Sequence, residues 1–401
     1  MKWEKVKLGE LYEVHNGLSK AGKFFGEGYP FLTFSTVFNN YFIPKQITDL
    51  VQSTEKEQES YSIRRGDVFV TRTSETSDEL GMSCVALKDY PMATYNGFTK
   101  RMRPITNRVF PEYIGYYMRL PSFRGEFRAF STMTTRASLR NEDLLGLEVK
   151  LPSIEIQKQI ADILSAYDDL IENNQKQIKL LEEAAQRLYK EWFVDLRFPG
   201  YETTPIVDGI PQGWERMVLS EVTSVLKRGI SPKYSDNGKY SVINQKCIRS
   251  SIMDISESRR QEKEYVPTLN LQDSDTVICS TGTGTLGRVG RVYGDYPNTT
   301  FDSHVTLVRA KENPNYIYHV VKSQQEYLMG MGRGSTNQQE LYRDVIERLV
   351  VLCPSQDILL KADRALNAIH CKIKAVYLQN NLLVESRDRL LPKLMSGEIE
   401  V

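Results

Sequence analysis

The chain contains 401 residues, 40% of them apolar, and this length predicts two domains of ordinary size because one hydrophobic core rarely organises so many residues. Its formal net charge is +1, so composition alone identifies no highly charged partner such as nucleic acid. The five cysteines form no Cys-x-x-Cys pair, which argues against disulfides and a structural zinc site and fits a reducing compartment.

Residues 1–150 constitute the first predicted domain. Charges are spread through residues 1–11, which lack the apolar run of a signal peptide, and no later window is apolar and long enough to span a bilayer. We therefore expect a cytoplasmic protein. The domain consists of short runs rich in Val, Ile, Phe, Tyr and Thr, separated by Gly, Pro, Asn and Asp. This pattern predicts an α+β domain of strands and turns with a few helices.

A long helix is predicted within residues 151–198, beginning just after Pro152, whose fixed φ and missing N–H suit a helix start. Residues at steps of three and four predict a seam for a partner helix, although Gln177 interrupts the seam where Ile178 lies beside it. The predicted pairing residues of this helix are Ile160, Ile163, Tyr167, Leu170, Asn174, Leu181, Ala184 and Leu188.

Residues 199–213, rich in Pro, Gly and Thr, are predicted to be a linker. A second domain is predicted at residues 214–352, and a second helix, within residues 353–401, begins just after Pro354. In this helix the alternating steps of three and four continue without a break. Its predicted pairing residues are Leu359, Ala362, Leu366, Ile369, Ile373, Val376, Asn380, Leu383, Arg387, Leu390 and Leu394.

The second half of the chain repeats the first. Trp3–Glu10 matches Trp214–Glu221 in its Trp, both Glu and the Leu, at identical spacing. The same order continues through the strand-like runs that start at Asp67 and Asp275, the Pro-x-Tyr-Ile runs at Pro111 and Pro314, and the Leu-x-Val runs at Leu147 and Leu349. An ordered series of matches over a whole half predicts an internal repeat with pseudo-two-fold symmetry.

Each copy ends in a helix that needs a partner, and we expect the two helices to pair as an antiparallel coiled coil. The alternative is that each helix folds onto its own domain. Asn174 and Asn380 in the seam are typical of residues that set register. A helix from Ile156 to Trp192 would be roughly 54 Å long at about 1.5 Å per residue, which corresponds to roughly sixteen base pairs at about 3.4 Å each. Duplicated domains on such a spacer favour duplex DNA with a split target.

Four segments carry a resemblance to a known family. They are Leu151–Leu164 (LPSIEIQKQIADIL), Trp192–Gly200 (WFVDLRFPG), Gly209–Trp214 (GIPQGW) and Arg387–Leu394 (RDRLLPKL). In this order, over essentially the entire chain, they resemble the specificity (S) subunit of type I restriction-modification systems. The run that starts at Pro354 departs from the pattern, because it lacks the Gln and Ile-Ala of the first copy. This leaves open whether both helices contact partner subunits equally.

The resemblance implies two target-recognition domains, each of which recognises one half of a bipartite DNA site, and helices that fix the spacer between the halves. It also implies assembly with two adenine-methylating modification subunits and with ATP-driven restriction subunits. The partner subunits are expected to use S-adenosylmethionine, ATP and Mg²⁺. This chain is expected to be non-catalytic and to bind no cofactor itself.

Two motifs resemble those of enzymes. Gly282–Gly287 matches a dinucleotide-binding fingerprint, but Arg288–Gly294 is predicted to be a strand, so a hairpin tip is favoured over a nucleotide site. Asn313–Tyr316 resembles the Asn-Pro-Pro-Tyr loop of adenine methyltransferases without its second Pro, and a helix start explains it and its repeat partner Phe110–Tyr113. The four histidines lack metal-ligand spacing, so we expect no metal site.

Polar and basic stretches in predicted loops are the candidates for DNA contacts, because Arg and Lys suit phosphates and guanine while Asn, Gln, Ser and Thr suit adenine and backbone oxygens. The candidate residues are Lys20, Lys23, Arg72, Ser74, Thr76, Lys100, Arg101 and Arg136 in the first domain, and Arg228, Lys233, Thr281, Thr283, Arg288, Arg333, Ser335 and Asn337 in the second. A solvated surface role is the alternative for any one of them. For the whole chain, the alternative function is a coiled-coil adaptor whose duplicated domains bind protein.

Overall fold

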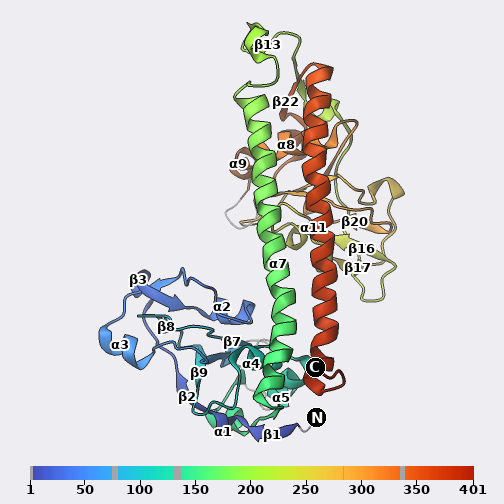
Figure 1. The fold of residues 1–401 in the computed structure, drawn as a ribbon. Helices are drawn as coiled ribbons and strands as arrows, with labels where there is room; N and C mark the ends of the chain where they lie inside the picture. The colour runs from blue at the N-terminus through green and yellow to red at the C-terminus, as the bar shows by residue number, and fades with distance from the viewer. Residues whose placement is uncertain (1–2, 75–79, 130–136, 283, 335–338) are drawn as a thin grey trace. The chain divides into compact units, whose positions relative to one another are not determined.

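A computed structural model describes residues 3–74, 80–129, 137–282, 284–334 and 339–401 (Figure 1). The chain forms two compact units, which are described separately. Unit 1 comprises residues 1–172 and 380–401, and unit 2 comprises residues 173–379. No helix among the described residues has the length and apolar character needed to cross a membrane.

Unit 1 contains a four-stranded antiparallel sheet, a three-stranded sheet and two short strand pairs. In sheet order these are β2 (Tyr12–Asn16), β9 (Thr99–Pro104), β5 (Val68–Thr71) and β7 (Ser83–Val85); β4 (Leu50–Val51), β3 (Phe25–Leu32) and β8 (Thr94–Tyr95); β1 (Glu4–Lys7) with β11 (Glu148–Leu151); and β6 (Thr73–Ser74) with β10 (Ala137–Ser138). Its shorter helices are α1 (Leu8–Leu11), η1 (Gly22–Phe24), α2 (Phe34–Asn39), α3 (Glu55–Ser60), α4 (Pro111–Tyr117), α5 (Pro121–Ala129) and α6 (Asn141–Gly146).

Unit 2 repeats this plan. Its sheets are, in order, β15 (Thr223–Arg228), β21 (Val305–Ala310), β18 (Thr276–Cys279) and β19 (Val289–Arg291); β17 (Arg259–Gln261), β16 (Tyr240–Ile243) and β20 (Thr299–Phe301); and β14 (Glu215–Val218) with β22 (Val350–Cys353). Its shorter helices are η3 (Lys190–Val194), η4 (Tyr201–Thr203), η5 (Leu219–Glu221), η6 (Gln245–Cys247), η7 (Ile255–Glu257), η8 (Pro267–Leu269), α8 (Pro314–Ser323), α9 (Gln325–Gly330) and α10 (Arg343–Glu347). The predicted α+β class and the internal repeat are confirmed.

The predicted linker contains a small hairpin, β12 (Ile206–Val207) with β13 (Ile210–Pro211). Its two ends are packed rather than loose, because the rings of Phe198 and Trp214 lie 4.7 Å apart and both side chains are buried. The segment therefore has a defined structure of its own.

One of the two central strands of each four-stranded sheet, β5 in unit 1 and β18 in unit 2, is buried on both faces. In β5, Val68 and Val70 join the core next to the helices, whereas Phe69 joins a second core under the three-stranded sheet. In β18 the alternation is the same, with Ile278 in one core and Val277 in the other. Because successive side chains of a strand point to opposite faces, a continuous apolar run here predicts a strand covered on both sides.

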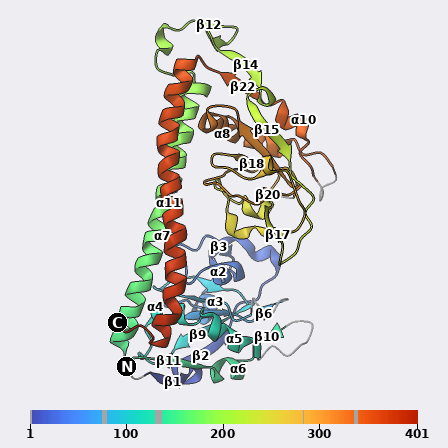
Figure 2. The same ribbon diagram turned by 90° about the vertical axis from the view of Figure 1, so that its right-hand side faces the viewer.

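Two long helices, α7 (Ile154–Tyr189) and α11 (Gln356–Ser396), contribute to both units. In unit 1 they pair through the amide of Asn380, which donates to the carbonyl of Ile171 at 3.3 Å, and through an ion pair of Arg387 with Asp168. In unit 2 the amide of Asn174 donates to Gln379 at 3.4 Å. Within each unit the helices lie side by side and antiparallel, and in unit 2 α8 lies against α11 (Figures 1 and 2). The predicted coiled coil and its two seam asparagines are confirmed.

The predicted seam of α7 is wrong at Leu170, which is 50% exposed, whereas Ile171 is 8% exposed. Ala184 is likewise exposed and Ala185 is buried. The buried face passes through Tyr167, Ile171, Asn174, Ile178, Leu181 and Ala185. The steps of three and four therefore alternate in the opposite order to the prediction, a choice that a helical period between 3.5 and 3.6 leaves open. The start of α7 also packs onto its own domain, so both expected modes of packing occur.

We expect Ile171→Ala to lower the free energy of unfolding by about 2–4 kcal/mol, because it leaves a cavity in the helix pair. Leu170→Ala should change it by less than about 0.5 kcal/mol, because the side chain is half exposed. Urea unfolding of the full chain measures both. Equal losses in the free energy of unfolding would show that Leu170 packs in the seam as Ile171 does.

Candidate nucleic-acid interface

In unit 1, the pairing of β6 with β10 joins the predicted DNA-contacting stretch that begins at Arg72 to residues 137–138. Ser74 lies opposite Ala137, and Thr73 lies opposite Ser138. The amide N–H of Leu139 donates to the carbonyl of Arg72 at 2.9 Å. The segment that follows Arg72 therefore lies against residues 137–139, and the predicted stretch that ends at Arg136 lies outside the described residues.

In unit 2, three predicted stretches meet around Glu340. Bridges join Glu340 to Thr281 and to Arg333. The guanidinium of Arg228 donates to the Glu340 carboxylate, and its Nε donates to the carbonyl of Ser303. The amide of Leu341 donates to the carbonyl of Ser280 at 2.8 Å.

These two meeting points occupy equivalent positions in the repeat. Arg72 directly follows the last residue of β5, and Ser280 directly follows the last residue of β18. Their carbonyls accept hydrogen bonds from the amides of Leu139 and Leu341, respectively. Their own amides donate to the carbonyls of Phe98 and His304 at 3.0 and 2.7 Å. Each domain thus brings its polar loops to the same end of its four-stranded sheet.

The first of these clusters is basic. The Arg72 guanidinium donates to the side chain of Asn16 at 3.4 Å, and the Lys100 ammonium donates to the side chain of Asn141. Burial lowers the pKa of Lys100, and the positive charge of Arg72 lowers it further. Asp143 opposes this effect, and Arg72, the less buried of the two cations, is the better candidate to contact an anion such as a phosphate.

Lys100 and Arg101 correct the sequence prediction, because they lie in β9 and not in a loop. Arg101 is 3% exposed, donates to the carbonyl of Ser62 at 2.8 Å and lies over the ring of Tyr95. Burial lowers its pKa. Arg101 is therefore an interior residue, and its prediction as a DNA contact is wrong. Lys100 lies next to Arg72 but is also buried.

Several other predicted cations have partners at the surface. The Lys20 ammonium pairs with Glu57 at 2.8 Å, and that of Lys233 with Glu262 at 2.8 Å. Lys23 lies over the ring of Phe24, and the exposed Arg333 lies over the ring of Tyr342. Lys20 and Lys233 are thus partly neutralised.

Both enzyme-like motifs have structural explanations. Arg288 follows the glycine-rich segment, and the next element is the strand β19, antiparallel to β18, so the predicted hairpin is confirmed. Pro314 and Pro111 occupy the first turns of α8 and α4, as predicted. Among the described residues, no group of three or more His, Cys, Asp or Glu side chains could hold a metal ion.

Five candidates, Thr76, Arg136, Thr283, Ser335 and Asn337, lie outside the described part of the chain, as does the side chain of Ser74. Asn16, Phe98, His304 and Glu340 also lie at these meeting points and were not predicted from the sequence. Alignment of the two copies would have found Phe98 and His304, since each stands two residues after an Asn or Asp that precedes a strand.

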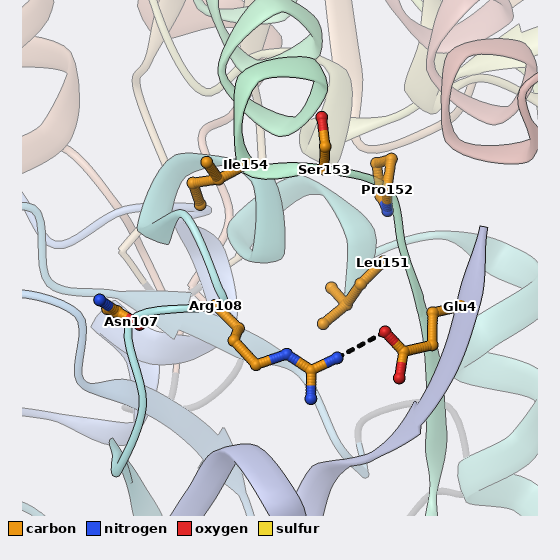
Figure 3. A pocket seen from close by; sticks show the side chains of 7 residues that line it. All are labelled: Glu4, Asn107, Arg108, Leu151, Pro152, Ser153 and Ile154. Carbon is orange, nitrogen blue, oxygen red and sulfur yellow. Dashed lines mark hydrogen bonds and ion pairs between the residues drawn. The ribbon is translucent and has the colours of Figure 1, made fainter. Parts of the chain in front are cut away.

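A hollow of about 740 Å³ lies elsewhere in unit 1, at the start of α7 (Figure 3). Arg108 extends across it to Glu4 on β1, at 2.6 Å. The residues Leu151, Pro152, Ser153 and Ile154 form its other side. Because its two charges neutralise each other and are half exposed, the hollow does not define a ligand site.

The duplicated α+β domain with paired helices is the architecture of a known class of protein. The family model described as "Type I restriction modification DNA specificity domain" matches residues 1–183 and 211–358. The chain belongs to this family, and the resemblance found in the sequence is confirmed.

Individual relatives match over the full length. The MjaIX type I restriction enzyme specificity subunit of Methanocaldococcus jannaschii is 27% identical, over 100% of this chain and 94% of that protein. The HindI specificity subunit of Haemophilus influenzae is 22% identical, over 99% of both. The crystal structure of the S subunit from M. genitalium has a TM-score of 0.57 at 16% identity, covering 98% of this chain and 96% of that one, and shows the same fold. These matches support a specificity subunit over a protein-binding adaptor.

Proposed function

We propose that this chain is the non-catalytic subunit that recognises DNA sequence for a type I restriction-modification complex. Each domain would recognise one half of a bipartite target, and the helix pair would set the spacing between the halves. The observation that carries this proposal is the convergence of polar and basic loops at equivalent places in two repeated domains. A duplicated binding surface suits a linear ligand that presents two separate sites.

The proposed partners follow from the same function. Two modification methyltransferase subunits would assemble on this chain and use S-adenosylmethionine, and restriction subunits would use ATP and Mg²⁺. The chain itself would supply base and phosphate contacts and no chemical step. Its helices present exposed apolar side chains, such as Leu180 and Leu382, to which helices of partner subunits could bind.

The decisive experiment is to co-express the chain with the methyltransferase encoded beside it and to map methylated adenines across the genome. Two short specific sequences around a fixed gap are expected. A purified complex that methylates without any split motif would contradict recognition by two domains.

Charge reversal at Arg72 or Arg288 should weaken DNA binding by the assembled complex roughly 5- to 100-fold, because each loses a phosphate or base contact and gains a repulsion. The control is Lys5→Glu, which reverses an exposed charge on β1, away from the β6 and β10 pair. Unchanged DNA affinity in both variants would show that these loops do not contact DNA. Absence of DNA binding by the unaltered complex would favour the adaptor function.

A further inference from the structure

Each domain carries a short turn that presents one ring at the meeting point of its loops. In unit 1 the turn is Asn96–Phe98, and in unit 2 it is Asp302–His304. The Asn96 side chain accepts from the amide of Phe98 at 2.7 Å, and the Asp302 side chain accepts from that of His304 at 2.9 Å. The two turns are built alike although their exposed rings differ in chemistry.

These turns are held rigidly. The amide of Gly97 donates to the carbonyl of Leu18 at 2.8 Å, which fixes the turn to the segment after β2. A Cβ on Gly17 would overlap the carbonyl oxygen of Asn96, and a Cβ on Gly229 would overlap that of Asp302. Because backbone lies directly against backbone in both copies, glycine is required there, and the backbone that carries the ring is held in place.

The exposure of Phe98 is unusual. At 57% it is the most exposed aromatic side chain among the described residues. The carbonyl of Phe98 accepts a hydrogen bond from the amide of Arg72 at 3.0 Å, so the backbone that carries this apolar ring adjoins the basic residue Arg72. An exposed apolar ring next to cations suits a ligand that combines negative charge with apolar surface, as a nucleic acid does.

His304 occupies the same place in unit 2 and is also exposed. Its Nδ1 lies 2.6 Å from the hydroxyl of Thr281, a contact that orients the ring and leaves Nε2 as the nitrogen directed to a ligand. An imidazole can exchange a hydrogen bond with a base edge, whereas a phenyl ring can offer an apolar contact alone.

We propose that Phe98 and His304 contact DNA bases, each in the half-site that its domain recognises. Phe98 would make an apolar contact with a base, such as a thymine methyl group, and His304 would hydrogen-bond to a base edge. The different chemistry of the two rings implies that the half-sites differ in sequence. This inference rests on the proposed function, because it assigns specificity within the same interface.

The test uses the full chain assembled with its methyltransferase subunits and DNA carrying the mapped methylation site. Affinity is measured over a series of salt concentrations. Phe98→Ala should weaken binding about tenfold or more without changing the slope of affinity against salt, because a phenyl ring neutralises no phosphate. The control, Ile105→Ala, removes an equally exposed side chain (58%) just beyond the other end of β9, roughly 20 Å away.

His304→Ala should relax discrimination in the other half-site and leave the first unchanged. Because both side chains are exposed, the variants should fold, and their unfolding in urea should match that of the unaltered chain. If Phe98→Ala binds like Ile105→Ala, the inference is overturned while the proposed function stands. A shallower salt slope in Phe98→Ala would also overturn it, since the ring would then act through phosphates. Failure of the unaltered complex to bind DNA would instead remove the proposed function.

Discussion

Replacing Asp67 by alanine should lower the free energy of unfolding of unit 1 by about 3–5 kcal/mol, because it leaves a partly buried guanidinium without its counter-charge. The carboxylate of Asp67 is fully buried and accepts from Nε and Nη2 of Arg103 at 2.8 and 2.6 Å. It also accepts from the amide of Arg64 at 2.7 Å. This pairing raises the pKa of Arg103. Native-state hydrogen exchange of the amides in β5 and β9 measures this loss of stability within unit 1.

The second copy of the repeat contains an equivalent ion pair. Asp275 and Arg309 form the same two-bond pair in unit 2, at 2.7 Å each. Burial raises the pKa of Asp275 despite the opposing effect of Arg309. Replacing Asp275 by alanine should lower the free energy of unfolding of unit 2 by a similar amount, because it too leaves a partly buried guanidinium without its counter-charge. The control is Asp357→Ala, which removes an exposed pair with Lys361 and should cost less than about 1 kcal/mol. An Asp67 variant no worse than this control would contradict the argument.

Acidification from pH 7.5 to pH 5 should destabilise unit 2 by roughly 2–4 kcal/mol through two buried histidines. His319 on α8 and His370 on α11 lie with their Nε2 atoms 3.0 Å apart, and the Tyr293 hydroxyl is 2.8 Å from Nδ1 of His370. Burial, followed by the charge of Arg291, lowers the pKa of His319 to about 3 and that of His370 to about 2.

The two imidazoles bind protons more readily in the unfolded chain than in the folded chain. Below pH 6.5 the unfolded chain protonates both imidazoles while the folded chain does not, so the stability present above pH 6.5 is lost as the pH falls. Urea midpoints at the two pH values measure the effect. The double variant His319→Phe/His370→Phe should lose the part of the pH dependence of stability that is due to these histidines and keep the part that is due to carboxylates. Equal pH dependence in both proteins would show that the pair protonates freely in the folded state.

The sequence predicted much of this architecture because the strongest signals are local. The run after Asp67 is apolar on both faces of a strand, and the seam of α11 is an unbroken heptad pattern that includes Asn380. The error at Leu170 arose because Leu170 and Ile171 are equally apolar, and which of them faces the partner depends on the helical phase.

The candidate site was predicted only as a set of loops. Arg101 looked like a surface cation because its carbonyl partner at Ser62 lies 39 residues away, a contact that no local pattern reveals. Phe98 was not predicted because an apolar ring in a loop carries none of the polar or basic chemistry that suggests a DNA contact. The convergence of these loops depends on the pairing of β6 with β10, strands of two residues each, which are too short to be recognised from sequence.

The discontinuous make-up of unit 1 has a consequence for its synthesis. Its core includes Leu391, Leu394 and Met395 from the end of α11, which cover Ile160 and Leu164 of α7. These covering residues leave the ribosome roughly 240 residues after α7 begins to emerge, a delay on the order of ten to fifty seconds. Unit 2 is a single stretch of chain and can close its core in that interval. The domain that is made first is therefore the one that finishes folding last.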